Sequence, residues 1–401
     1  MPAEVRCVTK VEGLLDRDLV VARWAIYAAF AFNGFAWGTF IPRLPDIKHT
    51  FALSNSQLGI TMLAASLGIL SALKPGGYLC ARYGSRRILL CATVYMSIAV
   101  MLLGVLASYS YFVFTLLLLG IATALQDISM NTHAATIEQA AGRSLMNGFH
   151  ARFSVGALVG GGCGALFTQF KVSLLMQMII VGFVGLATLP WFRKVLLPAE
   201  ADRHEPEPEN SSERQRPNIF YILGLLGFLA AVCEGSAADW GAILLRDTWH
   251  SSPFVSSLPF ILFSATMVIF RFSGDWVTDR FDREWVIRTG GLTSGFGLLV
   301  GVLIGGPVGI CLGFAMLGVG ISVAIPSVFS AASHIARTRF AGQISPAAAT
   351  AIIGGVSYSG FLLGPPLLGY VADAITLRWA MLIPAVFAIA LGLSARIVKS
   401  N

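Results

Sequence analysis

Long apolar runs recur along the chain, separated by short polar segments. They fall into two sets of six, which cover residues 21–43, 56–80, 88–108, 111–136, 146–169 and 172–192, then 218–245, 254–278, 286–305, 307–333, 346–371 and 377–396. A helix needs about 20 predominantly apolar residues to cross a bilayer, and a spanning segment must satisfy its backbone hydrogen bonds internally. The pattern predicts an all-α integral membrane protein with twelve transmembrane helices in two six-helix bundles.

The stretch between the two sets has a different composition. Residues 193–217 are rich in proline and charged side chains and have no apolar periodicity. This composition is typical of a solvated linker. We therefore expect an N-terminal half over residues 1–192, a cytoplasmic linker over 193–217 and a C-terminal half over 218–401.

Composition agrees with a membrane protein. Hydrophobic residues make up 56% of the chain and charged residues 12%, and the mean hydropathy is +0.74. The net charge of +7 suggests nucleic acid, yet Lys and Arg concentrate in the termini, the linker and alternate loops. The intervening loops hold only Arg43, Lys48, Lys171, Arg246 and Arg378. Because basic residues resist translocation, both termini are expected to be cytoplasmic, and no nucleic-acid partner is needed to explain the charge.

Motifs for other chemistry are missing from the sequence. The six cysteines are scattered without metal-like spacing, so we interpret them as packing residues and expect no metal site and no disulfide. The sequence has no phosphate-binding G-x-x-x-x-G-K-[ST] run, no H-E-x-x-H and no G-x-S-x-G. We expect no cofactor and no enzymatic activity.

The two sets of spans carry an internal repeat of about two hundred residues. Three pairs of segments match in the same order: 36–38 with 239–241, 81–86 with 279–284, and the glycine ladder 156–164 with 360–366. Duplicated bundles with parallel repeats place their substrate site between the halves near mid-membrane. The halves are therefore expected to be pseudo-symmetric, although the glycine ladders are also typical of close helix packing, which we favour for them.

The loop after the second span resembles a known signature. Gly77-Tyr78-Leu79-Cys80-Ala81-Arg82-Tyr83-Gly84-Ser85-Arg86 is similar to the G-x-x-x-D-[RK]-x-G-[RK]-[RK] loop of the major facilitator superfamily. Three further segments, residues 234–240, 271–274 and 364–370, resemble its bacterial inner-membrane branch related to fucose permease. The resemblance implies a monomeric multi-pass transporter of the inner membrane, with a small-molecule substrate, protons and the lipid bilayer as its partners.

The signature departs from the family at one position that matters. In the family its Asp helps to close the cytoplasmic side, but position 81 is Ala here, whereas the second-half copy keeps Asp279. We expect an asymmetric gate in which Asp279 faces the N-terminus of the fifth span near Leu145 and Met146, where the helix dipole favours a carboxylate. Arg271 and Asp275, four residues apart, are expected to pair. The gating residues are predicted to be Gly77, Arg82, Gly84, Arg86, Arg271, Asp275, Asp279 and Arg280.

The substrate site is predicted from the same resemblance. In this family the first, fourth, seventh and tenth spans surround the cavity, which implies that their polar and aromatic residues contact the solute. These residues are Asn33, Trp37, Asp127, Asn131, Glu234, Asp239, Trp240 and Ser322. For Trp37 and Trp240, core packing is the alternative and the favoured interpretation.

Ionisable residues inside a membrane are costly, so they tend to be paired or functional. We predict proton coupling by Glu234, which has no basic neighbour three or four residues away, and by Asp127. Asp127 has an alternative, because Arg152 on the fifth span is placed at a similar depth by the sequence and would hold it ionised as a structural ion-pair partner. Asp239 either serves the site, pairs with Arg246 or faces water.

These features predict a secondary active transporter that moves a small polar solute, for example a sugar-like one, by alternating access coupled to protons. Multidrug/proton antiport is the alternative, although Gly160 is followed by Gly161 rather than by the proline of the antiporter motif. A non-transporting membrane sensor is a third alternative, disfavoured by the short segment after the last span.

Overall fold

The computed structural model describes residues 16–142, 145–202, 217–340, 343–344 and 346–398, with the side chains of 16, 147, 273–279, 346 and 347 outside the described part. Helices form where the apolar runs predict them. Those of the first half are α2 (Asp16–Phe40), the short α3 (Leu44–Thr50), α4 (Asn55–Tyr83), α5 (Ser85–Leu103), α6 (Tyr109–Ala141), α7 (Met146–Gln169) and α8 (Leu174–Val195). Short 3₁₀ turns η1 (Ile41–Arg43) and η2 (Ala199–Ala201) follow α2 and α8.

The second half has the same number of spans, two of them interrupted. Its helices are α9 (Asn218–Trp249), α10 (Pro253–Arg280), α11 (Arg283–Ile304), α12 (Gly306–Ile321), α13 (Ala324–Thr338), α14 (Pro346–Ile375), α15 (Leu377–Ala380) and α16 (Leu382–Leu393), with η3 (Ser394–Val398) last. The tenth predicted span is thus α12 and α13, which are separated at Ser322 and Val323, and the twelfth is α15 and α16. The all-α fold with twelve spanning elements is confirmed.

Eleven helical segments of the described chain are long and apolar enough to cross a membrane. They include every predicted span except the fifth, α7, a 24-residue helix whose first turns carry His150 and Arg152. Polar residues near its beginning lower its hydropathy without shortening it.

The chain divides into two compact units. The first comprises Met1–Phe40 and Ala64–Asn210, and the second Ile41–Leu63 and Ser211–Asn401. Residues 41–63, which connect the first two spans, are therefore grouped with the helices of the second half. The boundary passes through α4, whose first turns belong to the second unit and whose remainder belongs to the first.

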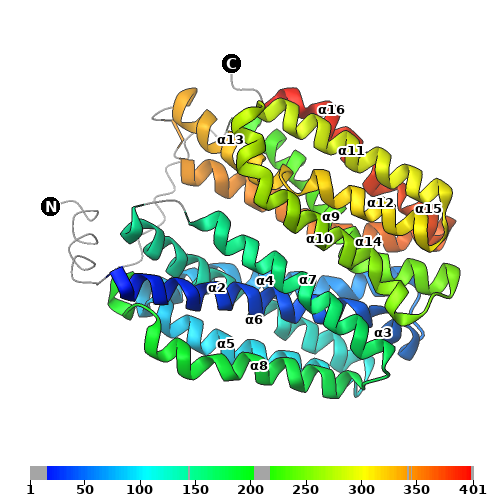
Figure 1. Ribbon diagram of the computed structural model, residues 1–401, viewed down its shortest axis with the longest axis horizontal. Coiled ribbons are helices and arrows are strands. Elements are labelled where there is room, and N and C mark those ends of the chain that lie inside the picture. Colours follow the sequence, from blue (N-terminus) through cyan, green and yellow to red (C-terminus); the bar gives the residue numbers. More distant parts are fainter. Residues whose placement is uncertain (1–15, 143–144, 203–216, 341–342, 345, 399–401) are drawn as a thin grey trace. The chain divides into compact units, whose positions relative to one another are not determined.

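In the first unit, α2 packs closely along α7 (Figure 1). A Cβ added at Gly156 would overlap the carbonyl oxygen of Ala31, and one added at Gly160 would overlap that of Phe35. These two rungs of the glycine ladder thus have the packing role that the spacing of four residues predicted, because only glycine lets the two backbones approach so closely.

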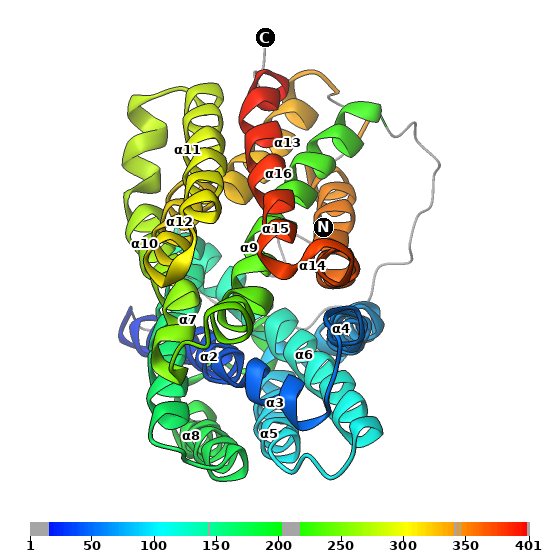
Figure 2. The ribbon, with the colours of Figure 1, turned by 90° about the vertical axis from the view of Figure 1, so that its right-hand side faces the viewer.

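In the second unit, α9 packs along α14, and α11 packs against both α12 and α16 (Figure 2). Gly227 on α9 faces Ser357 on α14, and Gly360 on α14 faces the carbonyl of Phe228. In the first half the first span packs along the fifth, and in the second half the corresponding seventh span packs along the eleventh. This agrees with the internal duplication seen in the sequence.

The first part of the predicted linker is folded rather than solvated. Helix α8 continues to Val195, and the next residues enter the core: Leu196, Leu197 and Ala201 are buried in one cluster with Leu89, Phe149 and Phe192. The prediction of a solvated segment from residue 193 is therefore wrong up to residue 202. We name residues 196–202 the strap. Its apolar residues are too few to show a helical period in the sequence, but they are enough to bury the segment: Leu196, Leu197, Ala199 and Ala201.

Candidate functional site

Three spans of the first unit are joined by a polar network. The side-chain amide of Asn33 on α2 donates to Oε1 of Gln126 on α6 at 3.0 Å, and Gln126 in turn donates to Thr93 on α5 at 3.3 Å. All three side chains are buried. Asn33 therefore holds helices together in this structure. Gln126 was not predicted, because an isolated glutamine gives no periodic signal in the sequence.

The matched tryptophans of the repeat lie in different surroundings. Trp37 is half-buried, and its indole N–H donates to the hydroxyl of Thr123 at 3.0 Å. Trp240 is only 1% exposed, and its indole N–H has no hydrogen-bond partner among the described residues. Core packing, the favoured interpretation, describes Trp240.

Asp127 on α6 is half-buried and is bonded within its own helix. The side-chain amide of Asn131, one turn later, donates to Oδ1 of Asp127 at 3.0 Å and to its backbone carbonyl at 2.9 Å. The sequence placed these two residues on one face, and the structure brings them together.

The structure does not pair Asp127 with Arg152. The Arg152 guanidinium lies over the ring of Tyr27, 4.7 Å from its centroid, and no ion pair joins it to Asp127 in the described part of the chain. The two residues lie at different depths. Asp127 is 14 residues, or about 21 Å, from the end of α6, whereas Arg152 is about 9 Å from the neighbouring start of α7. The interpretation that they share a depth was wrong.

Glu234 on α9 has a basic partner after all. Its Oε2 is 3.8 Å from Nη2 of Arg271 on α10, and Nε of Arg271 donates to the backbone carbonyl of Ser322 at 3.3 Å. The prediction searched for a basic residue three or four positions from Glu234, which finds partners only on the same helix. Arg271 lies on the next helix, so the search missed it. Ser322 takes part through its backbone, where α12 ends, and its hydroxyl donates to Val319. The predicted partner of Arg271, Asp275, has its side chain outside the described part.

Asp239 has a simpler environment. It is half-buried on α9, and no hydrogen bond or ion pair to it is formed by the residues that the structure describes. Arg246, its suggested partner, instead pairs with Asp46 at 2.7 Å. Arg246 lies seven residues further along α9, which is about 10 Å, and it turns toward the segment before α4. Asp239 is thus a carboxylate inside a span without a counter-charge in this part of the chain.

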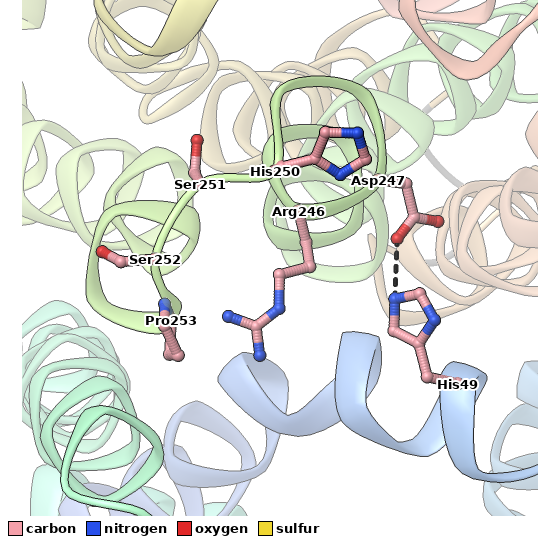
Figure 3. Close-up of a pocket in the computed structure, with 7 residues that line it drawn as sticks. All are labelled: His49, Arg246, Asp247, His250, Ser251, Ser252 and Pro253. Atoms are coloured by element: carbon pink, nitrogen blue, oxygen red, sulfur yellow. Dashed lines mark hydrogen bonds and ion pairs between the residues drawn. The ribbon is translucent and has the colours of Figure 1, made fainter.

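Charged residues of segment 41–63 contact the helices of the second half. Besides the pair of Asp46 with Arg246, both Lys48 and His49 bind the carboxylate of Asp247. Figure 3 shows His49 reaching Asp247 at the edge of a pocket of about 500 Å³, which is also lined by Arg246, His250 and the turn Ser251–Pro253. In the sequence these residues count only as loop charges.

A carboxylate of α14 completes these contacts. Asp373 accepts backbone hydrogen bonds from Asn55 at 3.0 Å and Ser56 at 2.8 Å, and so caps the N-terminus of α4. A Cβ on Gly369 would overlap the carbonyl of Asn55, so the two helices touch there. We name Asp46, Lys48, Arg246, Asp247 and Asp373 the loop clamp.

The signature loop is fixed by the strap of residues 196–202. Gly84 has φ +83° and faces Ala199 closely, so glycine is required there. The backbone N–H of Ser85 donates to Asp202 at 3.1 Å, and Arg86 donates to the carbonyl of Arg193. Of the other predicted gating residues, Gly77 is exposed, and exposed Arg82 donates to Tyr78 in its own helix.

Buried His133 ties the strap to the loop. The backbone N–H of Leu197 donates to Nε2 of His133 at 3.1 Å, and Nδ1 lies 2.7 Å from the hydroxyl of Ser85. Because Nε2 accepts, the imidazole is neutral and Nδ1 carries the proton. A lone histidine at this interface gave no signal in the sequence.

The N-terminus of α7 is already occupied by a carboxylate. Leu145 and Met146 donate their backbone N–H groups to Oε2 of Glu138 at 2.6 and 2.7 Å. These are the groups predicted to face Asp279. The Asp279 side chain lies outside the described part, and Arg280 is exposed at the end of α10. Glu138 is close in sequence to the loop before α7, so it reaches that helix end without help from the second half.

Comparison with known proteins shows which family the chain resembles. The sequence profile of the Major Facilitator Superfamily matches residues 26–345 and 236–399. An uncharacterized MFS-type transporter of Yersinia pestis is 28% identical over 371 residues, which cover 92% of this chain and 94% of that protein. Membrane protein MosC of Rhizobium meliloti is 27% identical over 373 residues, which cover 92% of this chain and 87% of that protein.

Solved transporters share the fold at lower identity. A bacterial homolog of the human lysosomal transporter Spinster, in an inward-facing and unoccupied conformation, has a TM-score of 0.77 at 14% identity, covering 97% of this chain and 100% of that one. The nucleoside transporter NupG has a TM-score of 0.70 at 13% identity, covering 95% and 100%. FucP in its outward conformation has a TM-score of 0.62 at 18% identity, covering 94% and 99%.

Proposed function

Because the chain belongs to the major facilitator superfamily and is thus a membrane transporter, we propose that it is a secondary active transporter that moves a small polar solute across the bacterial inner membrane, coupled to protons. The observation that carries the proposal is Asp239. An unpaired carboxylate within a span is costly unless it is used, and insertion scales put the penalty at about 2.5–3.5 kcal/mol. Asp239 has no counter-charge in the described chain.

The contacts of the other two carboxylates, Glu234 and Asp127, decide which residue we propose as the proton carrier. Glu234 lies 3.8 Å from Arg271, so its carboxylate already has a cationic partner. Asp127 accepts a hydrogen bond from Asn131 but has no cation beside it in the described chain. We therefore assign the proton to Asp239 first and Asp127 second, and give Glu234 a structural or substrate-orienting role with Arg271.

The solute class is inferred from the half-buried polar groups. Asp127, Asn131 and Trp37 on the first unit are accessible in part. Carboxylate and amide groups suit a solute that carries several hydroxyl or amino donors, and an aromatic ring suits the apolar face of a sugar. Sugars and polyols are therefore the first solutes to test, with cationic drugs as the probe for antiport.

The test uses purified protein in proteoliposomes with a pH-sensitive dye inside. Pools of sugars, polyols and cationic drugs are applied, and solute-dependent proton flux is recorded for Asp239→Asn, Asp127→Asn and Glu234→Gln. Glu200→Gln is the matched control, because Glu200 is a carboxylate with 59% of its side chain exposed. We expect Asp239→Asn to abolish proton flux while solute exchange without a gradient continues.

Two results would count against the proposal. Proton flux that survives both Asp239→Asn and Asp127→Asn would remove these residues as carriers. Failure of every pool to move in either direction, in protein that retains its thermal transition, would argue against secondary transport and favour a sensor.

A further inference from the structure

A groove with an apolar wall and a basic end runs between α5 and α8 in the first unit. Its volume is about 730 Å³. Leu90, Cys91 and Val94 line it from α5, and Leu189 and Pro190 line it from α8. The residues of α5 are one turn apart, so they share one helix face. The groove opens on the outside of the unit, because Cys91, Val94 and Pro190 are exposed.

The wall offers no hydrogen bonds to water or to a polar ligand. Its side chains are aliphatic apart from the thiol of Cys91, and Pro190 has no backbone N–H to donate. A groove of this kind at membrane depth is suited to a hydrocarbon chain.

The basic end lies at the end of the helix. Arg193 and Lys194 are in the last turn of α8, both are exposed, and both line the groove. They follow Leu189 and Pro190 by one turn, so the charges lie about 6 Å nearer the helix end than the apolar wall does. This order, charge at the interface and hydrocarbon beneath it, matches the order of phosphate and acyl chain in a phospholipid.

The positive charges at this end are available. Neither Arg193 nor Lys194 forms an ion pair within the described residues. Glu200, a few residues further along the chain, is 3.9 Å from Arg87, and the Arg86 side chain donates to the backbone carbonyl of Arg193. Arg86 therefore adds a third cation beside the groove instead of neutralising it.

We propose that this groove is a binding site for an anionic phospholipid, with the phosphate held by Arg193 and Lys194 and an acyl chain along Leu90, Val94 and Pro190. Basic pockets between transmembrane helices on the cytoplasmic side bind acidic headgroups, and the charge bias of the loops assigns this end of α8 to that side. The site shares no residue with the proposed proton carriers, Asp127 and Asp239, and does not depend on the proposed transport.

The experiment is native mass spectrometry of the full chain in detergent, with phosphatidylglycerol and phosphatidylcholine of equal chain length. The wild type is expected to retain phosphatidylglycerol preferentially. Arg193→Gln with Lys194→Gln should weaken that binding about thirtyfold, since each basic residue near an anionic surface contributes a factor of about five. The matched control removes two exposed arginines elsewhere, Arg337→Gln with Arg339→Gln, and should leave binding unchanged.

A second variant tests the wall while keeping the charges. Val94→Trp fills the groove from an exposed position, so it should lower phosphatidylglycerol retention without disturbing the core. If the double glutamine variant does not fold, Arg193→Gln and Lys194→Gln are tested singly, each with an expected loss of about fivefold.

Three outcomes would overturn the proposal. These are equal retention of both lipids by the wild type, an equal loss in the Arg337→Gln, Arg339→Gln control, and full displacement of the lipid by inorganic phosphate. The last would identify a site for a free anion with no use for the apolar wall.

Discussion

Replacing His133 by leucine tests whether the strap of residues 196–202 is a fixed part of the first unit. The substitution nearly preserves volume but removes the acceptor of the Leu197 N–H and the partner of the Ser85 hydroxyl. Both are buried, so neither group regains a hydrogen bond from water without opening the core. An unsatisfied buried polar group costs about 1–3 kcal/mol, which gives about 2–6 kcal/mol for the pair. At about 2–4 °C per kcal/mol, the thermal transition should fall by at least about 4 °C.

The transition is followed in detergent by size-exclusion chromatography after heating, with His334→Leu as the control because His334 is exposed. Hydrogen exchange adds a local readout: the amide of Leu197 should exchange much faster in His133→Leu, whereas amides of α9 should not change. If His133→Leu lowers the transition no more than His334→Leu does, or leaves exchange at Leu197 as in the wild type, the hydrogen bonds of His133 do not hold the strap.

Three further predictions concern single contacts. Gly84→Ala should lower the thermal transition by several degrees, because a φ of +83° and the nearness of Ala199 both exclude a Cβ; unchanged stability would contradict the close approach. Asp373→Asn should weaken the loop clamp by about 1 kcal/mol, read as faster hydrogen exchange at the first residues of α4; equal exchange would mean that the cap contributes nothing. Glu234→Gln should reduce the yield of folded protein, because Arg271 loses the carboxylate with which it pairs. Adding Arg271→Gln should restore the yield, whereas additive losses in the double variant would refute the pairing.

Much of the candidate site could not be predicted from the sequence, for one physical reason. Spacing along a helix predicts neighbours on the same helix, and it correctly joined Asp127 to Asn131. It has no information on what an adjacent helix presents. The partner of Glu234 on α10 therefore went unnoticed, and the carboxylate at the start of α7 was taken from the second half, although Glu138 lies only a short loop away.

The sequence by itself determined the number of spans, their order and their duplication. Hydrocarbon admits only segments that satisfy their own backbone, so about 20 apolar residues in a row suffice to fix a helix there. The glycine spacing of α7 likewise required close contact with another helix, because small side chains four residues apart form a flat stripe.

Only the tertiary structure decided which polar groups are neutralised. Whether a carboxylate is paired depends on distances of about 4 Å between helices far apart in the chain, as with Asp46 and Arg246, 200 residues apart. Burial of the strap after α8 also depends on tertiary packing, because its few apolar residues become core only by joining a cluster with residues of α2, α5, α6 and α7. Arg246 and Arg271 are paired with Asp46 and Glu234, and Asp239 has no ion-pair partner in the described chain. This is why Asp239 is a candidate proton carrier.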